Sequence, residues 1–308
     1  MVRLVIDTDP GVDDAHAILM ALAHPDVRVE ALTTVAGNVS LDHTTANALK
    51  ILDVAGRSDI PVYAGAPRAL LARNPFADYV HGQDGLGDSG WPESARSAEK
   101  EHAALALIRM ANENPGELTL VAIGPLTNLA LAVSLDPTLP GKYQRLVVMG
   151  GAIRAMGNTT PSAEFNTHAD PDAAAIVFEA WPKFTLVSWE TTMAHPFHAG
   201  QVAEMLAMQS PRAEFFRKIT ANTLKFIHEY LGQDMLFGAD FLAIAAAVEP
   251  QIVTYAEERY LDVELQGAKT RGQTVVDWFS RLGKPANASL VETMDAVRLW
   301  ELMQMALK

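Results

Sequence analysis

The chain has 308 residues, of which 49% are hydrophobic and 20% are charged. This is an ordinary globular composition, and no linker rich in Pro, Gly or Ser divides it. Acidic residues exceed Lys and Arg by 13 with no basic stripe to offset them, which argues against a nucleic-acid partner. The absence of cysteine excludes disulfide bonds. No apolar stretch reaches membrane-spanning length and no signal-peptide pattern opens the chain, so we expect a cytoplasmic protein without a membrane partner.

The first part of the chain alternates apolar strands with helices. Strands are expected at Arg3–Asp7, Val29–Val35, Val62–Ala64, Leu118–Ile123, Arg145–Met149 and Phe184–Ser188. Helices are expected at or near residues 13–23, 43–55, 99–112, 127–134 and 171–180. Because strands and helices alternate, right-handed crossovers should give a mainly parallel central sheet of Rossmann-like type, flanked by helices on both faces.

The pattern changes after residue 196. Helices are expected at residues 199–208, 211–231 and 236–248, then strands at Ile252–Leu265 and Thr274–Trp278, and a strand and a helix from about residue 290. We therefore expect a single domain over residues 1–308. Its α/β core should span residues 1–195, and residues 196–308 should form a mostly helical C-terminal cap region with closing strands and a final helix, packed against the carboxyl edge of the sheet.

The most informative segment is DTDPGVDD at residues 7–14, which places four carboxylates directly after the first strand. Like charges at this spacing raise one another's pKa, so a pocket that holds them needs a cation. Ligands that are all oxygen, with no cysteine and no close His pair, favour calcium or magnesium over zinc. Asp13 and Asp14 could instead only cap the following helix, but that accounts for two acids of the four.

Four later strand ends carry polar or Gly-rich residues. They are AGN at 36–38, GPLTN at 124–128, GG at 150–151 and SWE at 188–190. Each is a weak signal by itself, because such turns often serve only to bend the chain. In a parallel sheet, however, these ends meet at the edge where ligands bind, so we expect them to line one crevice.

Several segments together resemble the inosine-uridine preferring nucleoside hydrolase family. They are DTDPGVDD at 7–14, TTVAGN at 33–38, HGQDGLG at 81–87, GPLTN at 124–128, VVMGG at 147–151, GNTTPSAEFN at 157–166, DPDAA at 170–174 and the late Asp240. The N-terminal motif and the AEFN segment are highly specific. The resemblance implies an enzyme that hydrolyses the N-glycosidic bond of ribonucleosides to ribose and free nucleobase.

The resemblance also implies a role for individual residues. It implies a calcium ion (Ca2+) held by the side chains of Asp9, Asp14 and Asp240 and by the main-chain carbonyl of Ile123. Asp9 corresponds to the general base that activates water, and Asp7 to a supporting acid. The implied contacts to the ribose hydroxyls are Asp13, Asn38, Asn158, Glu164, Asn166 and Asp240. The family also implies a homodimer or homotetramer.

The residues themselves support parts of this assignment. Glu164 and Asn166 flank Phe165, which suggests that both polar side chains face one side of an extended segment. Asp240 lies in an otherwise apolar helix, where an unpaired carboxylate would be costly. Asn38 and Asn158 each follow a glycine and could instead be ordinary turn residues.

This set of residue types suits cleavage of an N-ribosyl bond. Positive charge grows on the sugar in an oxocarbenium-like transition state, and a carboxylate-rich floor stabilises that charge. Because metal and water occupy one side of the ribose, water should arrive opposite the base in a single displacement that inverts the anomeric centre. A deoxyribonucleoside would leave polar groups unpaired and should be a poor substrate.

One position departs from the family pattern. Many members that cleave inosine have a histidine directly before the late metal-binding aspartate, and here that position is Ala239. Candidates for protonating the departing base are His81, His168, His228, Tyr230, Trp189 and Glu190. We favour His228, because it lies shortly before the metal-binding helix, and place His81, Trp189 and Tyr230 on the base side. The loop near residues 72–92 and the cap helices should build the base pocket, so the sequence leaves the nucleobase open.

Two other functions fit parts of the sequence. A non-catalytic nucleoside-binding or sensor protein on the same fold would account for Ala239, although a sensor has no need for a water-activating Asp9. A metal-dependent phosphatase of the haloacid dehalogenase type also places Asp-x-Asp after its first strand. In this chain, however, Pro10 and Gly11 replace the usual Gly-Thr continuation.

Overall fold

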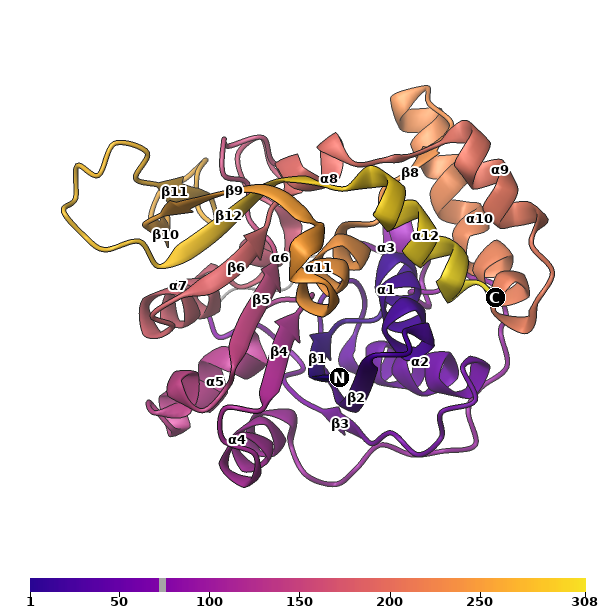
Figure 1. Cartoon of the computed structure of the whole chain (residues 1–308), viewed down its shortest axis with the longest axis horizontal. Helices are drawn as coiled ribbons and strands as arrows, with labels where there is room; N and C mark the ends of the chain where they lie inside the picture. The colour runs from indigo at the N-terminus through magenta and orange to yellow at the C-terminus, as the bar shows by residue number, and fades with distance from the viewer. Residues whose placement is uncertain (72–75) are drawn as a thin grey trace.

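The computed structural model of the chain describes residues 1–71 and 76–308. Within these residues, eight strands form a central sheet in the order β3-β2-β1-β4-β5-β6-β12-β9 (Figure 1). The strands are β1 (Val2–Thr8), β2 (Val27–Thr34), β3 (Val62–Ala64), β4 (Leu118–Ala122), β5 (Arg145–Met149), β6 (Phe184–Val187), β9 (Val253–Arg259) and β12 (Ala288–Met294). Neighbours pair in parallel, except that β9 runs antiparallel to β12. The predicted mainly parallel sheet is confirmed.

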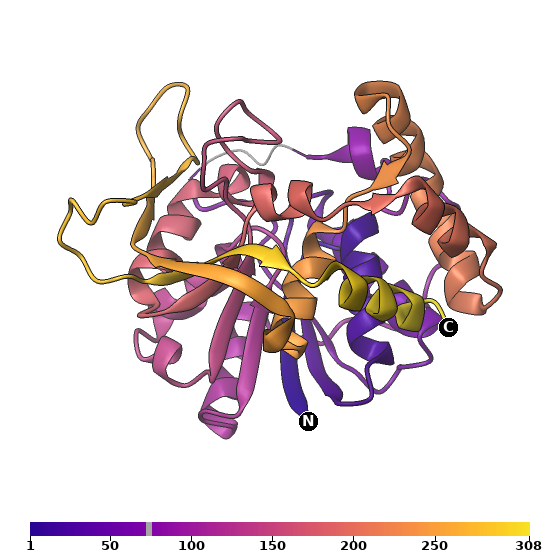
Figure 2. The ribbon, with the colours of Figure 1, turned by 45° about the horizontal axis from the view of Figure 1, so that its top comes forward.

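Helices cover both faces of this sheet (Figure 2). Along β1, Leu4 and Ile6 contribute to one buried cluster and Val5 to the other, because successive side chains of a strand point to opposite faces. The first cluster includes residues of α1 (Val12–Ala23), α2 (Leu41–Val54), α11 (Ala239–Val248) and α12 (Ala296–Ala306). The second includes residues of α4 (Ala103–Glu113), α5 (Thr127–Leu135) and α7 (Pro171–Ala180).

The first six strands follow the order 3-2-1-4-5-6 of a classic doubly wound sheet. In that order the chain reverses its winding direction between β1 and β4, and a crevice opens at their carboxyl ends. Asp9 follows β1 and Ile123 follows β4, and the Ile123 N–H donates to the Asp7 carbonyl at 2.8 Å. The topology therefore places the acidic segment at the expected ligand site.

Residues after 196 contribute strands as well as helices. α9 (Ala199–Ala207) and α10 (Pro211–Leu231) pack together, and β7 (Phe197–His198) pairs with β8 (Met235–Leu236). β12 and β9 extend the main sheet, and α11 packs against α1 on one face of it. A short hairpin of β10 (Leu261–Val263) and β11 (Thr274–Val276) projects with its loops at the left of Figure 1. No helix in the described ranges is both long and apolar enough to cross a membrane.

Two expected elements in this region were wrong in their extent. The expected strand Ile252–Leu265 is divided into β9 and β10, which belong to different sheets, and the intervening Tyr260 carbonyl accepts the Asp277 N–H at 2.8 Å. The expected helix at 236–248 begins only at Ala239, because Met235 and Leu236 pair with β7. Both differences come from tertiary pairing that a local pattern does not encode.

A partly buried ion cluster ties three helices together. Glu249, at the end of α11, accepts from Arg298 of α12 at 2.7 and 2.9 Å and contacts Nε2 of His24, at the end of α1, at 3.0 Å. The bonds from Arg298, and then the one from His24, lower the pKa of Glu249 to about 2. A carboxylate whose folded-state pKa is lowered stabilises the protein above its unfolded pKa and loses that contribution as the pH falls toward the folded value.

Replacing Arg298 with methionine should therefore destabilise the protein by about 1 kcal/mol at neutral pH, since the guanidinium is partly screened by solvent. The difference from wild type should shrink at about pH 4, where protonation of Glu249 in the unfolded chain has begun. Urea denaturation at the two pH values measures both effects. Arg57→Met, which breaks an exposed pair with Asp59, is the matched control and should change stability much less.

Candidate active site

A cavity of about 640 Å³ lies at the carboxyl edge of the sheet. Its polar lining comes from the segment after β2, from residues 158–166 and from the starts of α1 and α11, and includes Asp13, Asn38, Asn158, Glu164, Asn166 and Asp240. Its apolar lining comes mainly from α8 (Trp189–Ala194), α10 and the segment before α11, and includes Trp189, Phe226, Ile227, Leu236 and Phe237. The cavity thus combines a polar, acidic part with an aromatic part.

Three carboxylates converge where α1 meets α11. Oxygen atoms of Asp13, Asp14 and Asp240 lie within 4.8 Å of one another and could hold a metal ion. Asp14 accepts from the Thr8 hydroxyl at 2.5 Å and from the Gly11 N–H at 2.9 Å, so its carboxylate is fixed at the helix N-terminus. Asp240 stands in the first turn of α11, and 3% of it is exposed.

The pKa values show how costly this cluster is without a counter-ion. Burial, followed by the charge of Asp13, raises the pKa of Asp14 to about 6. Burial also raises the pKa of Asp13 to about 6. The pKa of Asp240 is raised well above its usual range, by burial first and then by the charges of Asp13, Asp14 and Asp9. These are all oxygen donors, so the cluster fits a hard divalent cation such as calcium or magnesium.

Asp9 is 1% exposed and is not among the residues that line the cavity, although its neighbour Asn38 is. Its Oδ2 accepts the Asn38 N–H at 2.7 Å. Burial, and then the charge of Asp14, raises its pKa well above the usual range. A Cβ atom at Gly37 would lie 2.0 Å from Asp9 Oδ2, so only glycine allows the strand-end turn to close over this carboxylate. Asp9 is outside the three-carboxylate group, which includes Asp13 instead.

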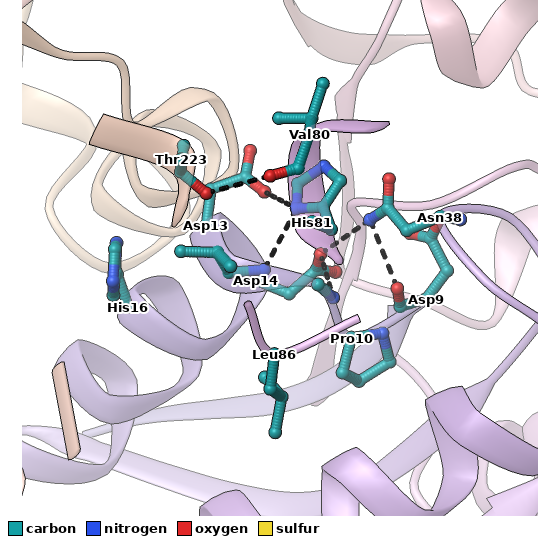
Figure 3. A network of polar contacts seen from close by, with 12 residues as sticks. Asp9, Pro10, Asp13, Asp14, His16, Asn38, Val80, His81, Leu86 and Thr223 are labelled. Carbon is teal, nitrogen blue, oxygen red and sulfur yellow. Dashed lines mark hydrogen bonds and ion pairs between the residues drawn. The ribbon is translucent and has the colours of Figure 1, made fainter. Parts of the chain in front are cut away.

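Two predicted site residues interact closely with the strand ends. The side-chain amide of Asn38 donates to the Asp9 carbonyl at 3.2 Å and to Asp14 Oδ2 at 3.1 Å (Figure 3). The side-chain amide of Asn166 donates to the carbonyls of Ile123 at 3.2 Å and Met149 at 3.3 Å. Both asparagines line the cavity, and each also orients a neighbouring group that was predicted to bind the metal.

The AEFN segment contains the N-cap and the first two residues of a helix, so its predicted extended conformation is wrong. Glu164 is the N-cap of α6 (Phe165–Ala169), and its carboxylate accepts from the backbone of Asn166 at 2.8 Å and Thr167 at 3.1 Å. It also accepts the Gly151 N–H at 2.8 Å. The first N–H groups of a helix have no partner within the helix, and the Glu164 carboxylate satisfies two of them. Glu164 and Asn166 still both line the cavity.

His81 lies at the end of α3 (Asp78–His81) and lines the cavity. Its Nδ1 accepts the Val12 N–H at 3.1 Å and lies 3.9 Å from Asp13 Oδ1. Burial lowers the pKa of His81 to about 4, so the ring is neutral near pH 7. Because Nδ1 is an acceptor, the single proton is on Nε2.

The prediction that His228 protonates the departing base does not fit the position of His228 on α10. Thr223, Phe226, Ile227 and Tyr230 share the face of α10 that lines the cavity, as expected for a helical period of 3.6 residues. His228 points from a different face; its side chain is 64% exposed and contacts Asp234 at 2.8 Å. The helix therefore directs His228 away from the cavity.

The remaining base-side candidates divide in the same way. Trp189 lines the cavity and packs against Phe237 with ring centroids 5.7 Å apart, and Tyr230 lines it and stacks on Phe226 at 5.4 Å. His168 is half-buried, with Nδ1 3.4 Å from the Arg271 carbonyl, and is not in the lining. Glu190 is also outside the lining and binds backbone N–H groups of a neighbouring loop.

The loop near residues 72–92, which was expected to build the base pocket, contributes to the lining. Residues 72–75 lie outside the described part of the chain, while Ala77, Tyr79, Val80 and His81 line the cavity.

Sequence reasoning missed one cavity residue, His16. It is 1% exposed, its Nε2 lies 3.0 Å from the Thr220 hydroxyl, and its ring contacts Phe216. Burial lowers its pKa to about 3. The sequence could have indicated His16, because it stands one helical turn after Asp13 and so lies on the same face of the helix. A single histidine in an apolar helix is, however, usually a packing residue.

The fold and the cavity define a doubly wound α/β enzyme with an acidic cradle for a cation below a pocket for a small organic molecule. The chain belongs to the inosine-uridine preferring nucleoside hydrolase family, whose model matches residues 4–301. It is therefore a nucleoside hydrolase that acts on ribonucleosides, as predicted. This finding excludes the phosphatase interpretation and confirms that the protein is an enzyme.

Relatives and solved structures agree with this assignment. The chain is 40% identical to "Probable uridine nucleosidase 2" of Oryza sativa subsp. japonica, over 89% of this chain and 82% of that protein. It is 36% identical to "Pyrimidine-specific ribonucleoside hydrolase RihA" of Salmonella schwarzengrund (strain CVM19633), over 99% and 98% of the two chains. The solved structures "Plant nucleoside hydrolase - PpNRh1 enzyme" and "Inosine-Guanosine Nucleoside Hydrolase (IG-NH)" match with TM-scores of 0.93, at 34% and 33% identity. Each alignment covers 99% of this chain and 98% of the solved one.

The acid cluster predicts an unusual pH dependence of stability. The folded-state pKa values of Asp13 and Asp14 are near 6, and burial raises that of Asp7 to about 7, all above their unfolded values. A carboxylate with a raised folded-state pKa loses stabilising free energy as the pH rises through that value. The metal-free protein should therefore melt at a lower temperature at about pH 8 than at about pH 5, and added calcium should reverse the loss.

Thermal denaturation with and without chelator measures this effect. Asp240→Asn is the matched variant, since it removes one charge from the cluster at nearly constant volume. It should flatten the pH dependence of the melting temperature and weaken the response to calcium. A melting temperature of the chelated wild type that rises steadily over this range would contradict the account.

Proposed function

We propose that the protein hydrolyses ribonucleosides with the assistance of calcium, by direct attack of water and inversion at the anomeric carbon. The observation that carries this proposal is the convergence of Asp13, Asp14 and Asp240 within 4.8 Å at the floor of the cavity. Asp14, Asp240, the Ile123 carbonyl and Asp9 would hold the ion, with Asp13 close by. When bound, the ion would neutralise this cluster and lower the pKa of the attacking water.

Asp9 is the proposed general base. The Asn38 N–H occupies Oδ2, so we assign Oδ1 as the oxygen that takes the proton from water. Gly37 and Gly124 pack directly against this carboxylate and hold it in place.

The polar part of the cavity would hold the ribose. Asp13, Asn38, Asn158, Glu164, Asn166 and Asp240 all line it. The positions of Glu164 and Asn166 are set by capping and strand-end bonds before substrate arrives, so little ordering entropy is lost on binding. The carboxylates of Asp13, Glu164 and Asp240 would also stabilise the positive charge that develops on the sugar.

His81 is the proposed partner of the departing nucleobase. Its Nε2–H can donate a hydrogen bond to a base that gains negative charge, while Nδ1 remains bonded to Val12. Trp189 and Tyr230 supply aromatic surface for the base. In this arrangement His81 takes over the role that we first gave to His228, and Ala239 leaves space in the cavity wall.

The names of the relatives make uridine the first substrate to test. The two curated relatives described above are named for uridine or for pyrimidine ribonucleosides, whereas one of the solved structures is named for inosine and guanosine. We infer a pyrimidine ribonucleoside as the preferred substrate from the sequence relatives. We also infer a homodimer or homotetramer, as the family resemblance implies, and light scattering measures this state.

The proposal is tested by release of reducing sugar from uridine. Wild type should release ribose, chelator should abolish the activity, and added calcium should restore it. Asp9→Asn should lower kcat by about a thousandfold or more, because the amide cannot accept the proton of water. Asp59→Asn, an exposed aspartate far from the cavity, is the control. Chelator-resistant activity in wild type would contradict the role of the ion.

The assignment of the base side is tested by comparing two leaving groups. His81→Ala should reduce kcat/KM for uridine about a hundredfold. It should reduce hydrolysis of p-nitrophenyl riboside far less, because nitrophenolate leaves without protonation. His228→Ala serves as the control and should affect both substrates only slightly. A larger selective loss in His228→Ala than in His81→Ala would restore the original assignment.

A further inference from the structure

We propose that Glu190 is a positioning residue that holds the loop of residues 152–158 in the shape that presents Asn158 to the cavity. This inference rests on the proposed ribose contact of Asn158. In this proposal Glu190 holds the backbone of the loop that precedes Asn158. It does not transfer a proton to the base, the role for which it was a candidate.

The carboxylate of Glu190 accepts three backbone N–H groups of this loop. Oε2 accepts the Ile153 N–H at 2.9 Å, and Oε1 accepts the N–H groups of Arg154 at 2.7 Å and Met156 at 3.4 Å. Both carboxylate oxygens are therefore used as acceptors. A glutamine side chain has one acceptor oxygen and would turn an amide N–H₂ toward a backbone donor, so it cannot reproduce this set.

The bound loop contains a backbone conformation that needs support. Ala155 has φ of 56°, in the left-handed region that is unfavourable for residues with a Cβ atom. It stands between Arg154 and Met156, two of the residues whose N–H groups Glu190 accepts. The hydrogen bonds to Glu190 therefore lie on both sides of Ala155, and they offset the cost of its backbone conformation.

The clamped loop leads directly to Asn158. Gly157 packs so tightly that a Cβ atom would lie 2.2 Å from the Thr160 carbonyl, and Asn158 Oδ1 accepts the Phe165 N–H at 2.8 Å. Asn158 is thereby tied to the start of α6, beside Glu164. A shift in residues 153–156 would be transmitted over two residues to a side chain that lines the cavity.

Glu190 belongs to a helical turn that contacts the strand end before this loop. It follows Trp189 in the first turn of α8, and the Trp189 N–H donates to the Gly151 carbonyl at 3.0 Å. This bond ties the start of α8 to Gly151 and so supports the position of the Glu190 carboxylate beside the loop.

The test is a double-mutant cycle of Glu190→Gln and Asn158→Ala, read as KM and kcat for uridine or another ribonucleoside that the enzyme hydrolyses. Glu190→Gln should raise KM about five- to tenfold with a smaller change in kcat, because lost hydrogen bonds of this kind are worth about that factor. Asn158→Ala should raise KM at least as much. The double variant should be no worse than Asn158→Ala alone, since Glu190 acts through Asn158.

Each other outcome has a definite meaning. If Asn158→Ala leaves KM unchanged, the proposed ribose contact fails and the role of Glu190 fails with it. If Asn158→Ala raises KM but Glu190→Gln does not, only the positioning role is overturned. Effects that multiply in the double variant also overturn it. A fall in kcat with unchanged KM would indicate a loss of folded enzyme and contradict positioning.

A second variant tests the strain at Ala155. Glycine adopts positive φ without the Cβ penalty, so Ala155→Gly in the Glu190→Gln background should recover a few-fold of the lost KM. Hydrogen exchange of the peptide that contains residues 152–158 should be faster in Glu190→Gln whether or not the variant is active; unchanged exchange would overturn the proposal. Glu292→Gln is the matched control, because Glu292 accepts from the side chain of Arg154 and, among the described residues, from no backbone N–H of the loop. Its loss should change KM less than twofold.

Discussion

The structure depends on a concentration of buried negative charge at the switch point of a doubly wound sheet. Asp9 directly follows β1, Asp13 and Asp14 lie in the first turn of α1, and Asp240 lies in the first turn of α11. Burial raises the pKa of all four carboxylates, and the charges of neighbouring carboxylates raise those of Asp9, Asp14 and Asp240 further. A protein would not retain such a cluster for stability, because each buried charge carries a desolvation cost. The cluster is compatible with function only if something positive binds there, either an ion or the developing charge of a substrate.

The neighbouring groups are arranged around that constraint. The Thr8 hydroxyl, the Gly11 N–H and the Asn38 amide all donate to Asp14, so its carboxylate has few arrangements open to it. Glycines at strand ends admit side chains that a Cβ atom would exclude, as at Gly37 beside Asp9. The sugar side is rigid for a similar reason, since Glu164 caps α6 and Glu190 clamps the loop before Asn158. Under the proposed function, rigid polar groups and an aromatic wall would together recognise ribose strictly and leave the base to stacking.

Much of this arrangement was predictable because it is local. Apolar runs such as Leu118–Ile123 predict strands, and the acids after β1 predict a cation at the sheet edge. The sequence could not show what depends on distant pairing. Residues 252–265 read as one strand but divide at Tyr260, and the AEFN segment reads as extended but is a capped helix. The outward direction of His228 follows from how α10 is rotated against the cavity. That rotation is set by the packing of Phe216, Ile219 and Thr220, which are buried. The local sequence does not show that these residues, and not His228, face the interior.

The most direct test of the central claim is calcium titration of the chelated protein by calorimetry, with the metal content measured on the same sample. The account predicts one ion per chain in wild type and strongly weakened binding in both Asp14→Asn and Asp240→Asn. Asp136→Asn, which removes a half-buried acid that is bonded to Lys142 and lies outside the cavity lining, should bind calcium as wild type does. No binding by wild type, or unchanged binding by the two cluster variants, would contradict the account.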